Sequence, residues 1–295
     1  MRLISTRHEG VATVGIAVED RWLPASALVD GPASTMIDLI ADPDGRLARM
    51  RSAAADGAAI RERGRSLADA DLLPPLGRPG KIVAIGRNYR EHLNEEGSDQ
   101  PAAPLVFSKW PSCVIGPGAE IRWDPDLTSQ VDYEAELAVV IGRRARRVTE
   151  RDALDYVFGY TCLNDVTARD VQFGDGQWVR GKSLDTFAPM GPLIVTADEI
   201  GDPQTLDISC TVNGDVRQQS NTGQMYFGVA EIVSYASQSF TLEPGDVIAT
   251  GTPGGVGHFR KPPVYLGDGD VVVVEIEKIG RLENTCRFDG AGVSA

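Results

Sequence analysis

The chain has 295 residues, of which 42% are hydrophobic and 24% are charged, a composition typical of a soluble globular protein with a sizeable core. Its formal net charge is −13 at pH 7, which argues against nucleic acid or an anionic membrane surface as the main partner. No stretch approaches the roughly 18 consecutive apolar residues that a membrane helix needs, so we expect no membrane association.

Cysteine use and the first residues point to the cytoplasm. The cysteines, Cys113, Cys162, Cys210 and Cys286, are dispersed and form no CxxC pair, so neither a zinc ribbon nor a disulfide scaffold is indicated. The opening residues "MRLISTRHEG" lack the apolar run of a secretory signal. We therefore expect a protein of the reducing cytoplasm.

The N-terminal quarter of the chain reads as a small accessory domain. Residues 2–30 alternate in short apolar bursts and predict a hairpin meander, and residues 34–63 predict helix. The segment "ADADLLPPLGRPGK" (68–81) then gathers three prolines and two glycines, as domain boundaries do. We place the accessory domain at residues 1–76 and the main domain at 77–295.

The rest of the chain is dominated by strands. Strands are predicted at 81–86, 103–110, 131–142, 156–165, 247–250 and 267–280, with short helices at 87–97, 167–172 and 228–240. Asn213-Gly214 separates two alternating runs, which is a strong hairpin signal. No βαβ rhythm repeats, so we expect a β-rich α+β fold.

The strand "VDYEAELAVVIG" (131–142) carries two carboxylates toward the interior. Glu134 and Glu136 share a face with the apolar Ala138 and Val140, and their like charges repel unless a cation intervenes. An all-oxygen set suits a hard ion such as Mg²⁺, Mn²⁺ or Ca²⁺, with Asp165, at the end of the next strand, as the third ligand. The alternative is a solvated edge strand, with Asp165 capping the turn at 167–172.

Three further features carry candidate chemistry. His92 and Glu95 lie three apart on a helical turn, where the carboxylate can orient the imidazole as a general base or form an ordinary surface pair. Lys182 lies among apolar residues, where it can meet a carboxylate or oxyanion or simply extend from the edge of the core. The glycine-rich "TGTPGGVG" (250–257) can present backbone amides to an anion or form a plain turn.

Six stretches of the chain follow one another in a specific order: "AIGRNYREHLNEEG", "LVFSKWPSCVIGPG", "VDYEAELAVVIG", "GYTCLNDVTARDVQ", "QWVRGKSLDTFAPMGP" and "DVIATGTPGGVG". Together they resemble the fumarylacetoacetate hydrolase superfamily over about residues 81–280. Within it, the chain is most similar to bacterial acylpyruvate and diketo-acid hydrolases. The resemblance implies a mixed β-sandwich roll, usually a homodimer, with a small N-terminal α+β domain.

The resemblance also implies a set of site residues. The metal, Mg²⁺ or Mn²⁺, is implied at Glu134, Glu136 and Asp165, and the catalytic residues are implied to be His92, Glu95 and Lys182. The residues implied to contact an α-keto acid substrate, or to support the site, are Lys109, Arg169, Gln172, Thr250, Gly251 and Thr252.

The activity implied is metal-dependent hydrolysis of a carbon–carbon bond in a 2,4-diketo acid, such as fumarylpyruvate or a diketo-deoxy sugar acid, to release pyruvate. A lyase that decarboxylates oxaloacetate or splits ureidoglycolate is the alternative, because the same metal site serves both reactions. A non-catalytic keto-acid binding protein is a third possibility, since membership of a fold does not fix activity.

Overall fold

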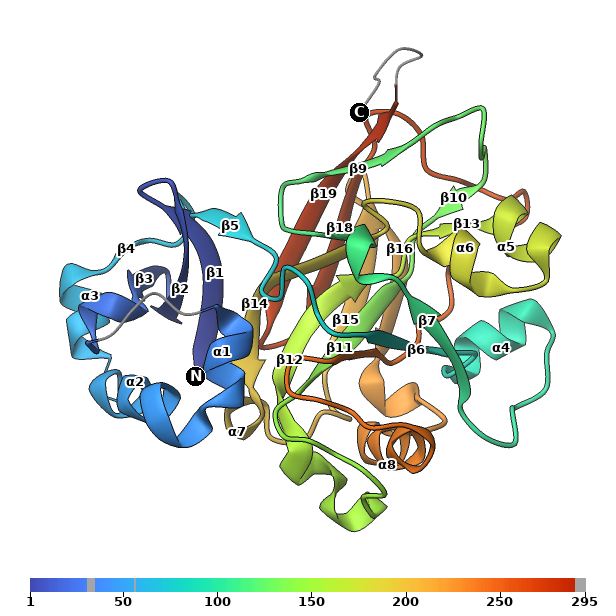
Figure 1. Ribbon diagram of the computed structural model, residues 1–295. Coiled ribbons are helices and arrows are strands. Elements are labelled where there is room, and N and C mark those ends of the chain that lie inside the picture. Colours follow the sequence, from blue (N-terminus) through green and yellow to red (C-terminus); the bar gives the residue numbers. More distant parts are fainter. Residues whose placement is uncertain (31–34, 56, 290–295) are drawn as a thin grey trace.

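The computed structural model describes residues 1–30, 35–55 and 57–289. It has a smaller lobe, formed by the N-terminal residues, beside a larger strand-rich body (Figure 1). The smaller lobe contains strands β1 (Arg2–His8), β2 (Val11–Val18), β3 (Arg21–Pro24), β4 (Arg65–Ser66) and β5 (Asp71–Leu73), and helices α1 (Met36–Ala41), α2 (Ala48–Ala53) and α3 (Ala58–Arg63).

The predicted meander at residues 2–30 is confirmed, because β1, β2 and β3 pair antiparallel in sequence. The predicted helix at 34–63 is present in three pieces. An irregular helical segment (Pro43–Leu47) separates α1 from α2, and Gly57, with a φ of 65°, precedes α3. Of this range, residues 34 and 56 lie outside the described residues.

One large sheet runs through both lobes. Its strand order is β4-β3-β2-β1-β14-β12-β11-β17-β6-β7. The strands of the body are β14 (Ala188–Thr196), β12 (Val157–Asn164), β11 (Ala135–Ile141), β17 (Val247–Ala249), β6 (Ile82–Gly86) and β7 (Leu105–Lys109). Since β1 pairs with β14 at Leu3 and Ile194, the lobes share a sheet, and the division at residue 76 stays a prediction.

A second sheet packs within the body. Its order is β16 (Asp215–Asn221), β15 (Asp207–Val212), β18 (Val271–Ile276), β19 (Gly280–Phe288) and β9 (Glu120–Trp123). Asn213 and Gly214 turn the predicted hairpin between β15 and β16, both with positive φ, which confirms the Asn-Gly signal. The shorter strands are β8 (Val114–Ile115), β10 (Val131–Asp132) and β13 (Thr167–Ala168).

The helices of the body are short and scattered around these sheets (Figure 1). They are α4 (Arg90–Glu96), α5 (Arg169–Asp175), α6 (Trp178–Lys182), α7 (Ala197–Ile200) and α8 (Val229–Ser239). The short helix predicted at 167–172 is present as α5, but its start is wrong, because Thr167 pairs with Asp132 in a two-stranded sheet and α5 begins at Arg169. The β-rich α+β fold is confirmed.

Strand β11 is buried on both faces. Leu137, Val139 and Ile141 belong to the core of the body, whereas Ala138 and Val140 share a second core with residues of the N-terminal lobe. The strand predicted at 131–142 is therefore not an edge strand, because β12 and β17 flank β11.

The predicted strand 131–142 is also not continuous. It is broken at residues 133–134 into β10 and β11, which pair with different strands. The break lets the chain change partner between Asp132 and Ala135, so the segment that carries Glu134 leaves the main sheet.

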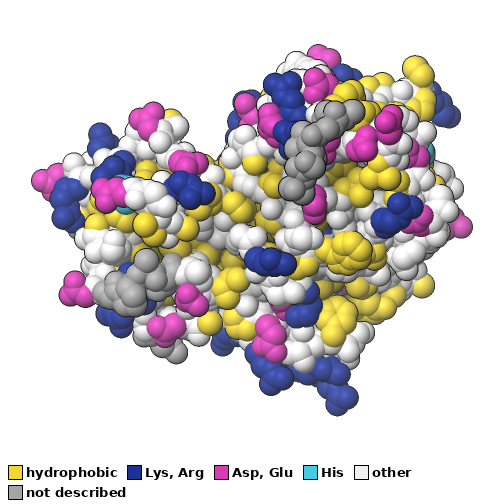
Figure 2. Space-filling view, turned by 45° about the horizontal axis from the view of Figure 1, so that its top comes forward, with side chains coloured by type: hydrophobic (Ala, Val, Ile, Leu, Met, Phe, Trp, Pro, Cys, Tyr) yellow, Lys and Arg dark blue, Asp and Glu magenta, His cyan; other side chains and the backbone are white. Residues whose placement is uncertain are grey.

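Charged side chains of both signs cover the outer parts of both lobes, and hydrophobic side chains gather between the lobes (Figure 2). Across the described ranges, no helix combines the length and the apolar character needed to cross a membrane.

Candidate metal centre and active site

Three carboxylates converge where β11 begins and β12 ends. Ala135 pairs with Asn164, and the Asp165 N–H donates to the Glu134 carbonyl oxygen at 2.9 Å. This register places one oxygen each of Glu134, Glu136 and Asp165 within 4.8 Å of one another. All three side chains are buried, which excludes the alternative of a solvated edge strand.

Asp165 is held by two lysines and does not cap the following turn. Lys182 Nζ donates to Asp165 Oδ2 at 2.9 Å and to Glu134 Oε2 at 2.5 Å. Lys109 Nζ lies 2.7 Å from Asp165 Oδ1. Of the two predicted roles of Lys109, the structure shows support of the site through Asp165, and Lys109 is absent from the residues that line the cavity.

A buried arginine joins the carboxylate cluster to its neighbours. The Arg169 guanidinium lies 2.9 Å from Asp132 Oδ2 and 2.7 Å from Glu134 Oε1, and it donates to Gln172 Oε1 at 3.2 Å. Asp132 also accepts from the backbone N–H groups of Gly257 and His258. Arg169 therefore fixes the carboxylate of Glu134 from the side opposite Lys182.

Glu136 differs from the other two carboxylates because no cationic side chain of the described residues pairs with it. Its Oε2 accepts from the Gly251 N–H at 2.8 Å. Burial, together with the Asp165 and Glu134 carboxylates, raises the pKa of Glu136 well above its usual range. A divalent cation fits here, because it would supply the missing positive charge to an all-oxygen donor set.

The other members of the cluster are held in charged form. Burial by itself would raise the pKa of Glu134, but Lys182 and Arg169 outweigh it and lower this pKa to about 2. Burial would lower the pKa of Lys182, but Asp165 and Glu134 raise it above its ordinary value. Lys182 is accordingly a fixed ammonium and not a neutral base.

His92 and Glu95 form the predicted dyad on α4. His92 Nδ1 lies 2.8 Å from Glu95 Oε1, and the edge of the His92 ring faces Phe259 with ring centroids 5.8 Å apart. Because Nδ1 is engaged by the carboxylate, Nε2 is the nitrogen left for proton transfer. His92 is only 8% exposed, so the dyad is not an ordinary surface pair.

The glycine-rich loop after β17 holds both the dyad and the carboxylates. The Gly255 N–H donates to Glu95 Oε2 at 2.7 Å, and the Gly251 N–H donates to Glu136. Thr250 Oγ1 donates to the Leu137 carbonyl oxygen. The amides of this loop thus bind carboxylates of the protein itself, and Thr250 and Gly251 are absent from the residues that line the cavity.

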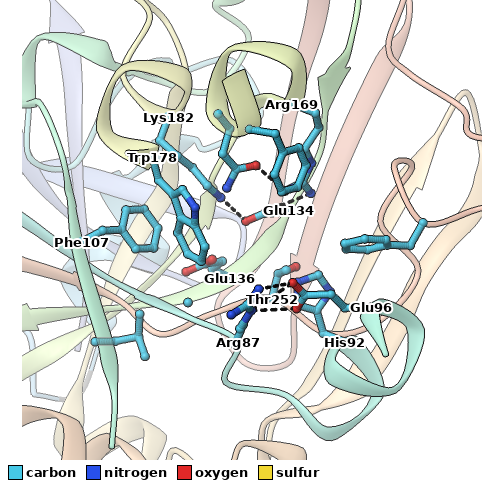
Figure 3. Close-up of a pocket in the computed structure, with 15 residues that line it drawn as sticks. Arg87, His92, Glu96, Phe107, Glu134, Glu136, Arg169, Trp178, Lys182 and Thr252 are labelled. Carbon is cyan, nitrogen blue, oxygen red and sulfur yellow. Dashed lines mark hydrogen bonds and ion pairs between the residues drawn. The ribbon is translucent and has the colours of Figure 1, made fainter. Parts of the chain in front are cut away.

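One cavity has His92 of the dyad and Glu134 and Glu136 of the cluster on its wall (Figure 3), whereas Glu95 and Asp165 are absent from the residues that line it. It is narrow: the empty space within it is about 440 Å³ when open solvent is included, but only about 30 Å³ is room for the centre of a water molecule. Of the predicted site residues, those on its wall are His92, Glu134, Glu136, Arg169, Gln172, Lys182 and Thr252.

Several residues of this site had not been predicted. Arg87, Glu96, Phe107 and Trp178 line the same cavity, and Gln218 supports it: its Oε1 accepts from the Ala135 N–H and its Nε2 donates to Thr252 Oγ1. They come from separate elements, so no local sequence pattern groups them.

The fold and this site define a member of a known enzyme family. The family model for the fumarylacetoacetate (FAA) hydrolase C-terminal domain matches residues 81–287, and the chain belongs to this family. The family includes hydrolases, isomerases and oxaloacetate tautomerases.

Three similar proteins illustrate the range. The mitochondrial oxaloacetate tautomerase fahd2 of Xenopus laevis is 48% identical over 221 residues, which cover 74% of this chain and 69% of that protein. The fumarylacetoacetate hydrolase structure from Exiguobacterium antarcticum has a TM-score of 0.84 and 38% identity, over 98% of this chain and 100% of that one.

The third is maleylpyruvate hydrolase from Sphingobium sp. SYK-6, solved with manganese(II) and pyruvate. Its TM-score is 0.79 at 34% identity, over 98% of this chain and 100% of that one. A manganese-bound relative and the buried carboxylate triad of this chain agree on a divalent-metal site.

Proposed function

We propose that this protein is a divalent-cation-dependent enzyme that interconverts the keto and enol forms of oxaloacetate. The observation that supports this most directly is that His92, which Glu95 holds through Nδ1, lies on the wall of one cavity together with the carboxylates Glu134 and Glu136. Similar proteins named oxaloacetate tautomerases, such as that of Xenopus laevis, give the substrate.

The cation would be held by Glu134, Glu136 and Asp165. When bound, a divalent cation supplies a Lewis acid and a template for the carboxylate and keto oxygens of a 2-oxo acid. We propose Mg²⁺ or Mn²⁺, since both suit an all-carboxylate donor set.

The side chains of the protein would then move the proton. His92 Nε2, with its ring oriented by Glu95, takes a proton from C3 of the substrate, and the electron pair of the C3–H bond becomes the C2–C3 double bond. The negative charge moves to the C2 oxygen, and the same proton returns there. The fixed ammonium of Lys182 stabilises the negative charge in the transition state.

A direct experiment follows the ultraviolet absorbance of the enol in stopped-flow mixing of oxaloacetate with the Mn²⁺-loaded protein. We expect catalysed equilibration that a chelator abolishes. His92→Ala should lose the catalysis while it still binds Mn²⁺ in calorimetry. A His92→Ala protein with undiminished rate would show that another group moves the proton.

Hydrolysis of a 2,4-diketo acid is the second candidate. It is favoured by the likeness to maleylpyruvate hydrolase, because the same dyad could instead activate water for attack on the distal carbonyl. Release of pyruvate from an acylpyruvate would identify this activity, and release of CO₂ from oxaloacetate would identify the decarboxylase alternative.

We also propose that the protein is a homodimer. Strand β7 is an edge of the large sheet, and it exposes Leu105 and Val106, followed by Trp110, which is 53% exposed. An open edge with apolar side chains favours association with a second copy. Light scattering on a size-exclusion column tests this.

A further inference from the structure

An ion pair that the proposed proton transfer does not use lies on the wall of the same cavity (Figure 3). Arg87 follows the last residue of β6, and Glu96 is the last residue of α4. Arg87 Nε lies 3.0 Å and 2.9 Å from the two carboxylate oxygens of Glu96, and Nη2 contacts Oε1 as well. The Arg87 guanidinium thus binds the Glu96 carboxylate through two nitrogen donors.

Arg87 is paired with a carboxylate outside the buried cluster, unlike the other cationic side chains on this wall. Within the described part of the chain, the lysine and arginine side chains of the wall are Arg87, Arg169 and Lys182. Arg169 and Lys182 are bound to the buried carboxylates of the cluster. Arg87 is bound to a residue of the helix that carries the dyad, so its partner can be exchanged without disturbing the cluster.

The position of Glu96 is unfavourable apart from this pair. A carboxylate in the last turn of a helix faces the negative end of the helix dipole. The Arg87 and Glu96 side chains are 36% and 14% exposed, so both reach solvent. A ligand carboxylate in the place of Glu96 would keep the guanidinium paired, while the Glu96 side chain turns outward to water.

The surroundings of Arg87 fit a short ligand that ends in a carboxylate. The Arg87 guanidinium lies 5.9 Å from the centre of the Trp178 ring, and Trp178 packs edge-on against Phe107 with ring centroids 5.3 Å apart. A side chain at Gly86 would lie 2.5 Å from the Trp178 ring, so the absence of one lets the indole approach. The wall thus offers an aromatic surface followed by a cationic end, beside the carboxylate of Glu136 (Figure 3).

We propose that Arg87 binds the substrate carboxylate distant from the cation, and that Glu96 occupies this place in the free protein. The inference rests on the proposed function and assigns recognition of the second carboxylate of a dicarboxylic 2-oxo acid to Arg87. Arg87 is in this view a specificity residue, and a bidentate guanidinium suits that role because it matches the planar geometry of a carboxylate.

Equilibrium binding to the full-length, Mn²⁺-loaded protein tests the inference without relying on turnover. Two dicarboxylic probes, oxomalonate and 2-oxoglutarate, are one carbon shorter and one carbon longer than oxaloacetate. Two monocarboxylic probes, pyruvate and 2-oxobutyrate, lack the distal group. Calorimetry on the wild type and on the variants Arg87→Met, Arg87→Lys and Glu96→Gln gives the dissociation constants.

Of the two dicarboxylic probes, we consider the one that the wild type binds more tightly. We expect Arg87→Met to weaken its binding about ten- to a hundredfold, because a charged hydrogen-bonded partner is lost. The dissociation constants of the monocarboxylic probes should stay unchanged. Arg87→Lys should fall between the two. Glu96→Gln should strengthen dicarboxylic binding only. The matched control is Arg90→Met, because Arg90 is an exposed arginine near the start of α4 that stacks on Tyr226 outside the cavity.

Three results would overturn the inference. If Arg87→Met weakens the binding of dicarboxylic and monocarboxylic probes equally, or weakens neither, Arg87 does not bind the distal carboxylate. If Glu96→Gln weakens the binding of every probe, the Arg87–Glu96 pair serves to hold α4 in place and is not a ligand site. If no probe binds even the wild type, the proposed function fails together with the inference, whereas binding of pyruvate alone leaves the proposed function intact.

Discussion

The Glu95 carboxylate accepts a hydrogen bond from the backbone N–H of Gly255 at 2.7 Å. This bond connects α4, which carries the dyad, to the loop that also binds Glu136. The other oxygen of the same carboxylate engages His92. A single side chain thus sets the direction of the imidazole relative to the carboxylate cluster.

Glu95→Gln should lower kcat by about 10²- to 10⁴-fold, the usual contribution of a positioned base. His92 and Gly255 contact different oxygens of the Glu95 carboxylate, so a carboxamide, in which one of these oxygens becomes an NH₂ donor, loses one of the two contacts. Steady-state kinetics with Mn²⁺ calorimetry checks this, since metal affinity should not change. Glu91→Gln is the control, because Glu91 lies on the same helix but bonds to Ser220 at the surface. An unchanged kcat in Glu95→Gln would refute the positioning role.

Gly255→Ala should destabilise the protein and also lower kcat. Gly255 has a φ of 103°, and an added Cβ would lie 2.2 Å from the Arg217 carbonyl oxygen, so the loop must move and release Glu95. Gly118→Ala isolates the backbone cost, since Gly118 has a φ of 73° with no atom within 4 Å of the added Cβ. That cost is about 1–2 kcal/mol, and urea unfolding should give a larger loss for Gly255→Ala. Equal losses would contradict the steric argument.

Two substitutions at the proposed metal ligands should have opposite effects on the metal-free protein. Asp165→Asn leaves the buried ammonium groups of Lys109 and Lys182 short of a countercharge, which should cost about 3–5 kcal/mol. Glu136→Gln removes a buried carboxylate that has no cationic partner among the described side chains, so stability should be kept or raised. Both should lose Mn²⁺ affinity. Urea unfolding in chelator gives the stabilities, and a large loss in Glu136→Gln would show that its charge is compensated.

Cation binding should release a proton from Glu136. The raised pKa means that the metal-free folded state keeps this proton above the ordinary glutamate pKa of 4.5, and a bound cation requires the carboxylate. Mn²⁺ affinity should therefore rise with pH until it passes the raised pKa. Calorimetry in buffers of different ionisation enthalpy measures the released proton, and an observed enthalpy that is independent of the buffer would contradict this.

The same shift fixes how metal-free stability depends on pH. A carboxyl group with a raised folded-state pKa stabilises the fold below its unfolded-state pKa, and this contribution is lost as pH rises through the folded-state pKa. Wild-type stability in chelator should therefore fall over that window relative to Glu136→Gln. Parallel curves for the two proteins would show that Glu136 is ionised throughout.

The sequence predicted most of the strands and the convergence of Glu134, Glu136 and Asp165, for a local reason. Alternation along residues 135–141 marks a strand, and the apolar Ala138 and Val140 on the face of Glu136 indicate that this face is buried. The convergence of Asp165 follows from the pairing of adjacent strands. The break at residues 133–134 was missed, because alternation continues through it while the hydrogen-bond partners change.

The parts of the site that depend on distant contacts could not be predicted from local patterns. Arg87 and Glu96 meet because α4 folds back over the end of β6. Lys109 lies behind Asp165 because β7 pairs with β6 at that position. The predicted role of the loop amides as an anion cradle misjudged which carboxylates they bind, since Gly251 and Gly255 bind glutamates of the protein itself.

The burial of β11 between two cores bears on how a cation is received. Glu136 is fixed to a strand whose neighbours on both sides and on both faces are already packed, so its carboxylate has few alternative positions to lose on coordination. Most of the conformational entropy of the Glu136 side chain is therefore lost during folding and little is lost at metal binding. A site of this kind should discriminate ions by their size more sharply than a flexible loop would, because it cannot readily contract or expand around the wrong ion.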